Sequence, residues 1–210
     1  MQNPASRNGR AILWTRQDIR SLDELKANGV IRIRRHHLVE KFDLIADYII
    51  GLYSWFVQMA SRRVPKPEGV EFPVWCSVSE ENMLRPTEDT VVYVLEVDES
   101  EVIYFDGSKW DHVLNHIYIP KDVADEARYR AEMARRGHDN LFAFFDTATA
   151  HFYTRERKEV MDSWPRVFEI DEWSIFKVQG NLWEIRPDMI REILFADGTR
   201  QVYSDGYRPA

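Results

Sequence analysis

The sequence predicts an α+β fold in a single domain over residues 11–205. Apolar and aromatic segments typical of strands are interspersed with helical segments, without the regular alternation of a doubly wound parallel sheet. The 210 residues suffice for one good hydrophobic core, and the chain has no internal repeat. We therefore expect a mixed or antiparallel sheet with packed helices, and loose termini at 1–10 and 206–210.

The first part of the chain predicts a strand followed by a short helix. The segment AILWT at 11–15 has the apolar character of a short buried strand. Ser21 with Glu24 three residues later forms a capping box, and Gly29 ends the helix that begins there. Apolar and basic residues alternate in VIRIRR at 30–35, so its arginines share one face.

The next part predicts a long helix and three strands. Apolar side chains recur at helical spacing from about residue 37 to residue 62, and Pro65 lies beyond the end of this pattern. FPVWCSV at 72–78 is typical of a strand that enters a loop. The β-branched and aromatic segments 90–97 and 101–105, joined by a polar turn, predict a hairpin.

A helical region follows. Ser108 can cap a short helix over 109–116, and a charged helix is expected over about 123–136. The amphipathic stretch 139–163 predicts two helical pieces with a break near Thr154.

The last part predicts strands again. Residues 173–185 form the last long strand candidate, with Gly180 as the position of a bulge. Residues 191–195 and 201–203 predict a terminal hairpin, because Asp197-Gly198 is a preferred pair for a tight turn.

The composition fits a protein of the reducing cytoplasm. The single cysteine, Cys76, excludes an intramolecular disulfide and an all-cysteine zinc site. The first ten residues lack a secretory signal, and no segment reaches the roughly 20 apolar residues of a membrane-spanning helix. The net charge of −7 disfavours broad binding to nucleic acid. We expect a cytoplasmic protein with no membrane partner.

Common catalytic motifs are absent. His112 and His116 have the spacing of metal ligands on one helix face, but no third ligand or known zinc motif accompanies them. We therefore expect two ordinary histidines and no metal. The sequence also lacks the GxSxG, P-loop and GxGxxG motifs, which removes the usual support for serine hydrolases, P-loop NTPases and simple dinucleotide-binding folds.

The segment RIRRHH at 32–37 is a basic cluster in an acidic protein. Arg32 and Arg34 offer planar forks of donors that suit a phosphate or pyrophosphate. The alternative is a solvated strand end whose arginines pair with neighbouring carboxylates.

Polar residues from the two ends of the chain form the main candidate site. Thr15, Arg16 and Gln17 lie at the exit of the first strand, and Gln179 and Glu184 lie on a late strand. If the two strands are neighbours, these polar groups and the aromatic segments between them can line a cleft for a ring-bearing, phosphate-bearing ligand.

The whole chain resembles an uncharacterised family of bacterial and phage proteins that is known only as a domain of unknown function. The resemblance extends from residue 12 to about residue 195, and the family name implies no activity. The matching segments are centred on tryptophans: LWTRQ, YSWFVQM, EFPVWCS, YFDGSKWDHVLN and WPRVFEI with VQGNLWEI.

More distantly, the two ends resemble ADP-ribosyltransferases of the DarT-like or RNA-phosphotransferase-like kind. This resemblance implies a split sheet, with NAD as a substrate. Gln179 would lie beside the nicotinamide ribose with Glu184 as the second catalytic residue. Trp14 or Trp75 would stack on the nicotinamide ring. The full set that it implies around NAD is Trp14, Thr15, Arg16, Gln17, Arg32, Arg34, Trp75 and Ser77.

The sequence departs from that family at two places. No histidine stands in the first motif, and Asn181 takes the place of a glutamate two residues after Gln179. Glu184 is the nearest acid, but strand alternation points it to the opposite face unless Gly180 bulges the strand. Either the bulge brings Glu184 into the site, or Glu184 is a solvent-facing residue near Arg186 and only the fold persists.

Two functions are therefore expected. The first is an NAD-consuming transferase that modifies a nucleic acid or protein acceptor, as a toxin or phage-conflict protein with a neutralising partner. The second is a non-catalytic module that binds a phosphate-bearing ligand or a partner protein through the basic cluster and an aromatic groove.

Overall fold

The computed structural model describes residues 3–138 and 140–203 in two compact units. We call residues up to Phe105 together with those from Asp171 onward the sheet unit, and residues Asp106–Ile170 the helical unit. The fold class is α+β, as predicted, and the predicted range 11–205 is subdivided between these units.

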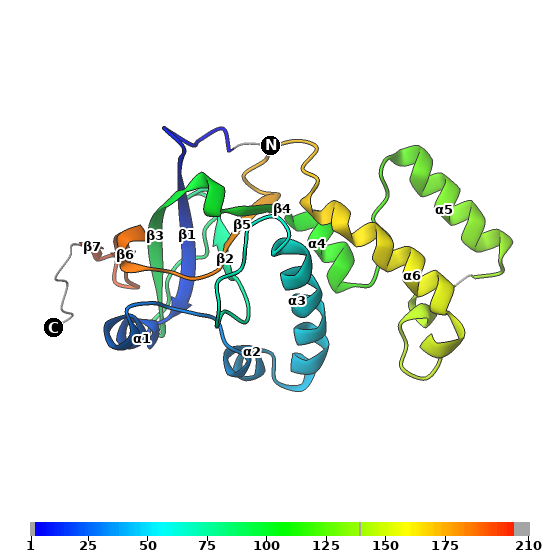
Figure 1. Ribbon diagram of the computed structural model, residues 1–210, viewed down its shortest axis with the longest axis horizontal. Coiled ribbons are helices and arrows are strands. Elements are labelled where there is room, and N and C mark those ends of the chain that lie inside the picture. Colours follow the sequence, from blue (N-terminus) through cyan, green and yellow to red (C-terminus); the bar gives the residue numbers. More distant parts are fainter. Residues whose placement is uncertain (1–2, 139, 204–210) are drawn as a thin grey trace. The chain divides into compact units, whose positions relative to one another are not determined.

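The sheet unit is built on an antiparallel sheet of seven strands (Figure 1). The strand order is β4-β5-β2-β1-β3-β6-β7, so β1 lies in the middle of the sheet. The strands are β1 (Arg10–Asp18), β2 (Val74–Ser77), β3 (Thr90–Asp98), β4 (Ile103–Asp106), β5 (Val178–Leu182), β6 (Ile190–Leu194) and β7 (Arg200–Val202).

The order of the strands corrects the predicted hairpin of 90–97 and 101–105. Both segments are strands, but β3 pairs with β1 and β6, and β4 lies at the far edge beside β5. A 3₁₀ turn, η2 (Glu99–Glu101), separates them, and Asp98 caps it by accepting a hydrogen bond from the Ser100 N–H. Because both edges of β3 are occupied, β4 has to pair elsewhere.

The helices of the sheet unit are α1 (Ser21–Asn28), α2 (Arg35–Phe42) and α3 (Ala46–Ala60). The single helix predicted over 37–62 is wrong, because the chain turns a corner at η1 (Asp43–Ile45). Asp43 has a φ of 45°, which a continuous helix does not accept. The apolar spacing runs through the corner and therefore hides it.

An aromatic cluster joins α3 to the sheet, and Figure 1 shows α3 beside β2. The Trp75 ring centroid on β2 lies 5.1 Å from that of Tyr53 and 5.3 Å from that of Phe56, both on α3. Phe105 on β4 completes the cluster at 5.1 Å from Trp75. Phe56 and Phe105 are fully buried, so this cluster forms the core on that side.

Two further predictions about the sheet unit are corrected. The segment 30–35 is not a strand, because Ile31 and Ile33 make only isolated bridges, with Ile185 and Phe72, and Arg35 already begins α2. Residues 3–10 belong to the terminus that was expected to be loose, but hydrogen bonds fix them to the sheet unit. The Asn3 N–H donates to the Glu99 carboxylate over 2.7 Å, and Asn3 is buried. Residues 206–210 lie outside the described residues.

At the C-terminal end, the predicted strand 173–185 shortens to β5, and the terminal hairpin of β6 and β7 is confirmed. Gly180 does not bulge β5, because it pairs in regular register with Cys76. A register shift lies instead between β3 and β6, at Val94 and Leu95.

The helical unit contains three α-helices and three 3₁₀ turns among its described residues. Asp106 caps α4 by accepting from the Ser108 and Lys109 N–H groups, so the predicted Ser108 cap is wrong. The predicted break near Thr154 is the start of α6, and residue 139 of that prediction is not described. The elements are α4 (Gly107–Leu114), α5 (Val123–Arg135), η3 (Leu141–Phe144), η4 (Ala150–Phe152), α6 (Thr154–Ser163) and η5 (Trp164–Phe168).

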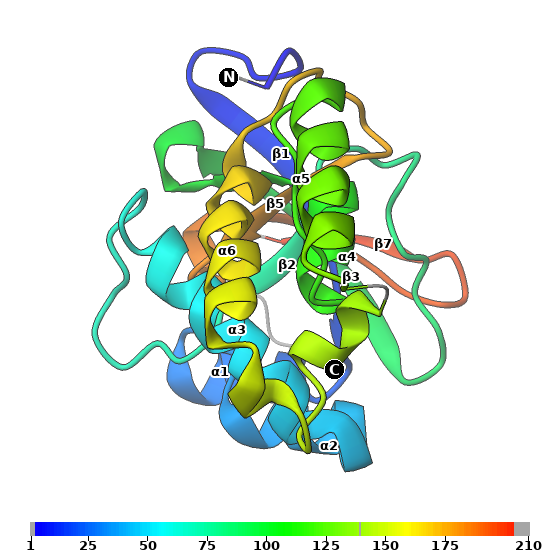
Figure 2. The same ribbon diagram turned by 90° about the vertical axis from the view of Figure 1, so that its right-hand side faces the viewer.

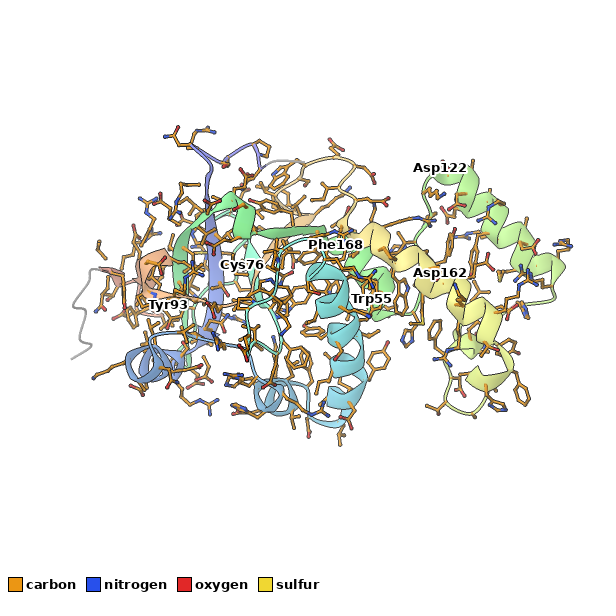
Figure 3. All side chains as sticks on the ribbon, viewed as in Figure 1. Trp55, Cys76, Tyr93, Asp122, Asp162 and Phe168 are labelled. Carbon is orange, nitrogen blue, oxygen red and sulfur yellow. The ribbon has the colours of Figure 1, made fainter. Side chains whose placement is uncertain are left out.

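Figure 2 shows α5 and α6 side by side, and charged contacts join them. The Arg136 guanidinium, at the end of α5, lies 3.2 Å from Glu156 and 3.3 Å from Glu159 on α6. Trp164 is buried in this unit. Figure 3 labels Asp122, Asp162 and Phe168 in the helical unit, and Trp55 on α3 of the sheet unit. None of the helices in the described ranges is long and apolar enough to cross a bilayer.

We expect Gly180→Ala to destabilise the protein by about 1–3 kcal/mol, because an added methyl group overpacks the core. Its Cβ would lie 3.1 Å from the Val102 side chain and 3.4 Å from Leu13. Gly51→Ala is the matched control in α3, where nothing lies within 4 Å, and it should stabilise by about 0.5–1 kcal/mol. Urea unfolding measures both, and equal effects of the two variants would contradict this packing.

We expect stability to fall as the pH drops from about 6.5 towards 4, in part through His116. Burial, and secondarily the Arg157 charge, lower the pKa of His116 to about 4. The unfolded chain therefore binds this proton more readily than the folded protein, which favours unfolding over that window. Free energies of unfolding at pH 7, 5.5 and 4 should decline less in His116→Phe than in the native protein. Identical declines would exclude the histidine as a source.

Candidate functional site

Three predicted site residues lie in one row across neighbouring strands. β2 lies between β1 and β5, and the Cα partners of Ser77 are Trp14 on β1 and Gln179 on β5. Cα partners in a sheet point to the same face. The three side chains are half-buried, so solvent reaches this row. The opening strand and the late strand therefore do present polar and aromatic groups together.

A second pair, Trp75 and Asn181, follows on the same face. Each lies two residues from a member of the row, and the two are Cα partners. Asn181 is fully buried, and its Nδ2 donates to the Val74 carbonyl over 3.1 Å. The Asn181 Oδ1 has no hydrogen-bond partner among the described residues. A buried acceptor without a partner is costly, so this oxygen is suited to receive a donor from water or a ligand.

Hydrogen bonds of Ser77 and Asn82 fix the loop that follows β2. The Ser77 hydroxyl donates to the Asn82 carbonyl over 3.0 Å, and the Asn82 Nδ2 donates to the Ile175 carbonyl over 3.0 Å. These bonds tie the loop after β2 to the segment before β5. A hydroxyl that donates one hydrogen bond retains lone pairs, so Ser77 can still accept from a ligand.

Thr15 and Gln17 lie on the other face of β1. Thr15 pairs with Tyr93 on β3 and is 2% exposed. Its hydroxyl donates to the Trp75 carbonyl over 2.8 Å and accepts from the Gln17 Nε2 over 2.7 Å. These bonds fix β1 against β2 and leave Thr15 inside the core. The structure thus separates Thr15 and Gln17 from the row.

Cys76 shares this inner environment, and it and Tyr93 are labelled within the sheet in Figure 3. The cysteine is buried, and burial raises the pKa of its thiol to about 12. A thiol that stays protonated is a poor nucleophile.

Glu184 lies beyond the end of β5 and is engaged by arginines. Its Oε2 accepts from the Arg32 Nε and lies 2.8 Å from a second Arg32 nitrogen, and its Oε1 lies 3.7 Å from Arg186. The Glu184 side chain is 10% exposed. Because β5 has no bulge at Gly180, Glu184 does not enter the row by the expected route. The interpretation of a residue near Arg186 holds, but Glu184 is buried rather than facing solvent.

The rest of the basic cluster borders an open hollow of about 600 Å³. Arg34 donates to the Gly69 carbonyl over 2.5 Å and lies 3.4 Å from the Glu71 carboxylate. The Arg35 N–H, at the start of α2, donates to Glu71 over 2.7 Å. These arginines therefore already hold an acidic side chain. The hollow is lined by Arg34, Arg35, His36, Val39 and Glu71.

Arg16 points to the face of the row and has no carboxylate within ion-pair distance among residues 3–138 and 140–203. Its guanidinium is exposed and donates to the Arg85 carbonyl over 3.2 Å. Desolvation, and secondarily the charge of Arg16, lower the pKa of Lys41 on α2. The sequence analysis did not include Lys41 in the site. A signal was available: Lys41 has no acidic residue three or four positions away, the spacing at which helical ion pairs form.

His112 and His116, the pair with metal-ligand spacing, do not converge. The His112 Nδ1 lies 2.9 Å from the Ser108 carbonyl, and His116 has a φ of 55° beyond the end of α4. The His116 ring stacks on Phe145 with centroids 4.0 Å apart. Within the described part of the chain, no three potential metal ligands come together.

Comparison with known proteins gives a family without an activity. The family model described as Domain of unknown function (DUF3841) matches residues 12–191. No curated protein and no solved structure matches the chain.

We expect Glu184→Gln to lower the free energy of unfolding by about 2 kcal/mol, because it leaves the Arg32 charge without its buried partner. Glu80→Gln is the matched control, since Glu80 pairs with Arg200 on the exposed surface and should cost less than about 0.5 kcal/mol. Denaturant unfolding compares the two. A neutral Glu184→Gln would show that this carboxylate is not part of the structural framework.

Proposed function

We propose that this chain, which belongs to the family of the domain of unknown function DUF3841, is an NAD-consuming transferase. The protein would release nicotinamide and transfer ADP-ribose to a nucleic acid or protein acceptor. The observation that carries the proposal is the row of Trp14, Ser77 and Gln179 across three adjacent strands. A half-buried aromatic ring, a hydroxyl and an amide on one face suit a nicotinamide ribose.

Each residue of the row has a role in this proposal. The Trp14 indole offers a flat face for the nicotinamide ring. Ser77 keeps acceptor capacity for the carboxamide N–H of nicotinamide, and the Gln179 carbonyl oxygen can accept from a ribose hydroxyl. Arg16 lies two residues after Trp14 on the same face, where its guanidinium can neutralise a phosphate.

The reaction breaks the bond between the ribose C1′ and the nicotinamide nitrogen. Nicotinamide leaves with the bonding electrons, the acceptor forms a new bond to C1′, and its proton passes to solvent. Positive charge develops on the ribose during this step, so fixed dipoles that face it stabilise the transition state. In the row this contribution comes from the Gln179 carbonyl, and the acid residue Glu184 stays with Arg32.

The engagement of Glu184 favours a second candidate function. Arg32 holds the Glu184 carboxylate, so no acid residue takes part in the row. The face that carries the row can then bind a phosphate-bearing ligand or a partner without turnover. The basic hollow beside α2 is a further surface of this kind. This non-catalytic module predicts saturable binding of a nucleotide and no release of nicotinamide.

We expect purified protein to release labelled nicotinamide from NAD, and Gln179→Ala to slow this release by about 10²-fold, the usual cost of losing a preorganised group. Parallel reactions with added nucleic acid or cell protein identify the acceptor by transfer of label. Gln201→Ala is the matched control, because Gln201 lies on β7, the edge strand beyond β3 and β6, and it should leave the rate unchanged.

Thermal shift with NAD separates the two candidates, because a ligand that binds the folded state raises Tm. A raised Tm without nicotinamide release would replace the transferase with the binding module. Neither binding nor release would overturn both functions.

A further inference from the structure

We propose that Arg16 and Lys41 form a binding site for the diphosphate of a nucleotide at the C-terminal end of β1. The inference rests on the proposed function, because it places the phosphate end of the ligand whose ring lies over the row. Lys41 becomes a ligand-binding residue contributed by α2, a helix outside the sheet.

An ion-pair bridge brings α2 to the end of β1. Arg20, which follows β1, lies 2.8 Å from Asp18 on that strand and 2.9 Å from Glu40 on α2. Lys41 is the residue after Glu40, and Arg16 precedes Asp18 by two positions on the same face of the strand. The bridge therefore places the two cations at one end of β1, where Figure 1 shows α2 below the sheet.

The two carboxylates of the bridge, Asp18 and Glu40, are both bound to Arg20 and pair with neither cation. Neither Arg16 nor Lys41 has an ion pair among the described residues. The contrast with the surrounding segment is clear, because the other arginines between residues 10 and 41 all have carboxylate partners: Arg10, Arg20, Arg32, Arg34 and Arg35.

Lys41 is exposed on α2, and its ammonium lies 5.3 Å from the centroid of the Phe42 ring, a cation–π contact that favours the charged form. Partial desolvation, and secondarily the Arg16 charge, lower the pKa of Lys41. A dianionic phosphate between the two side chains would relieve their repulsion and raise that pKa. The region is thus electrostatically arranged for an anion.

The distance along β1 fits a nucleotide. Trp14 and Arg16 are separated by two residues of strand, or roughly 7 Å. One ribose separates a nicotinamide ring from the diphosphate, so the ring can lie on Trp14 while the diphosphate reaches Arg16 and Lys41. The arginines that the sequence first indicated for this task are engaged elsewhere, Arg32 with Glu184 and Arg34 with Glu71.

We expect inorganic pyrophosphate to bind the full chain, and Lys41→Met and Arg16→Met each to weaken binding by at least about tenfold, since a lost charge-assisted contact costs at least about 1.4 kcal/mol. Lys26→Met, on the exposed last turn of α1, is the matched control and should bind as the native protein does. Lys41→Arg should retain binding, because it keeps the charge. Calorimetry measures the affinities.

A second readout follows the lysine itself. NMR titration of the Lys41 side chain should give a higher pKa in the presence of pyrophosphate than in its absence, with no change at Lys26.

No pyrophosphate binding by the native protein, or equal binding by Lys41→Met, would overturn the inference. Nicotinamide release tested separately keeps the two proposals distinct. Release that depends on Gln179 but not on Lys41 would refute this site and leave the transferase. Pyrophosphate binding that requires Lys41, without nicotinamide release, would support this site and refute the transferase.

Discussion

The pairing of β1 along both of its edges is the constraint on which the sheet unit depends. β1 is in register with β3 over its whole length, from Arg10 opposite Asp98 to Asp18 opposite Thr90. On the other edge, the buried hydroxyl of Thr15 bonds the Trp75 carbonyl of β2. A slip by one residue would exchange the two faces of β1 and bury Arg16 in place of Thr15. The candidate site exists because this register is fixed.

Local patterns predicted most of the elements, and long-range pairing decided the errors. The apolar segment of β1, the Gly29 that ends α1 and the Asp-Gly turn of the last hairpin all lie within a few residues. The predicted capping box of Ser21 and Glu24 is wrong, because Arg20 is the N-cap of α1 and Ser21 bonds Tyr93 instead. The position of β4 depends on which strands have already occupied the edges of β3, which neighbouring residues do not encode. The corner at Asp43 was missed for a related reason, because apolar residues continue through it at helical spacing.

The candidate site was predictable in its members but not in its arrangement. Trp14, Ser77 and Gln179 were each indicated by the sequence, and the register of three strands brings them into one row. The role of Glu184 was not predictable, because its partner Arg32 is 152 positions away in the sequence. The distant resemblance assigns this carboxylate to catalysis. In the structure it binds Arg32 and so joins the segment between α1 and α2 to the segment after β5.

The helical unit leaves the sheet at the end of β4 and the chain returns to it at β5, two strands that are neighbours in the sheet. In topological terms the unit is therefore a long excursion between adjacent strands, a connection that a short loop could also make. The registers of β1, β2 and β5 are formed only by residues of the sheet unit, so the alignment of the candidate row is set by strands that flank the excursion in sequence and not by the excursion itself.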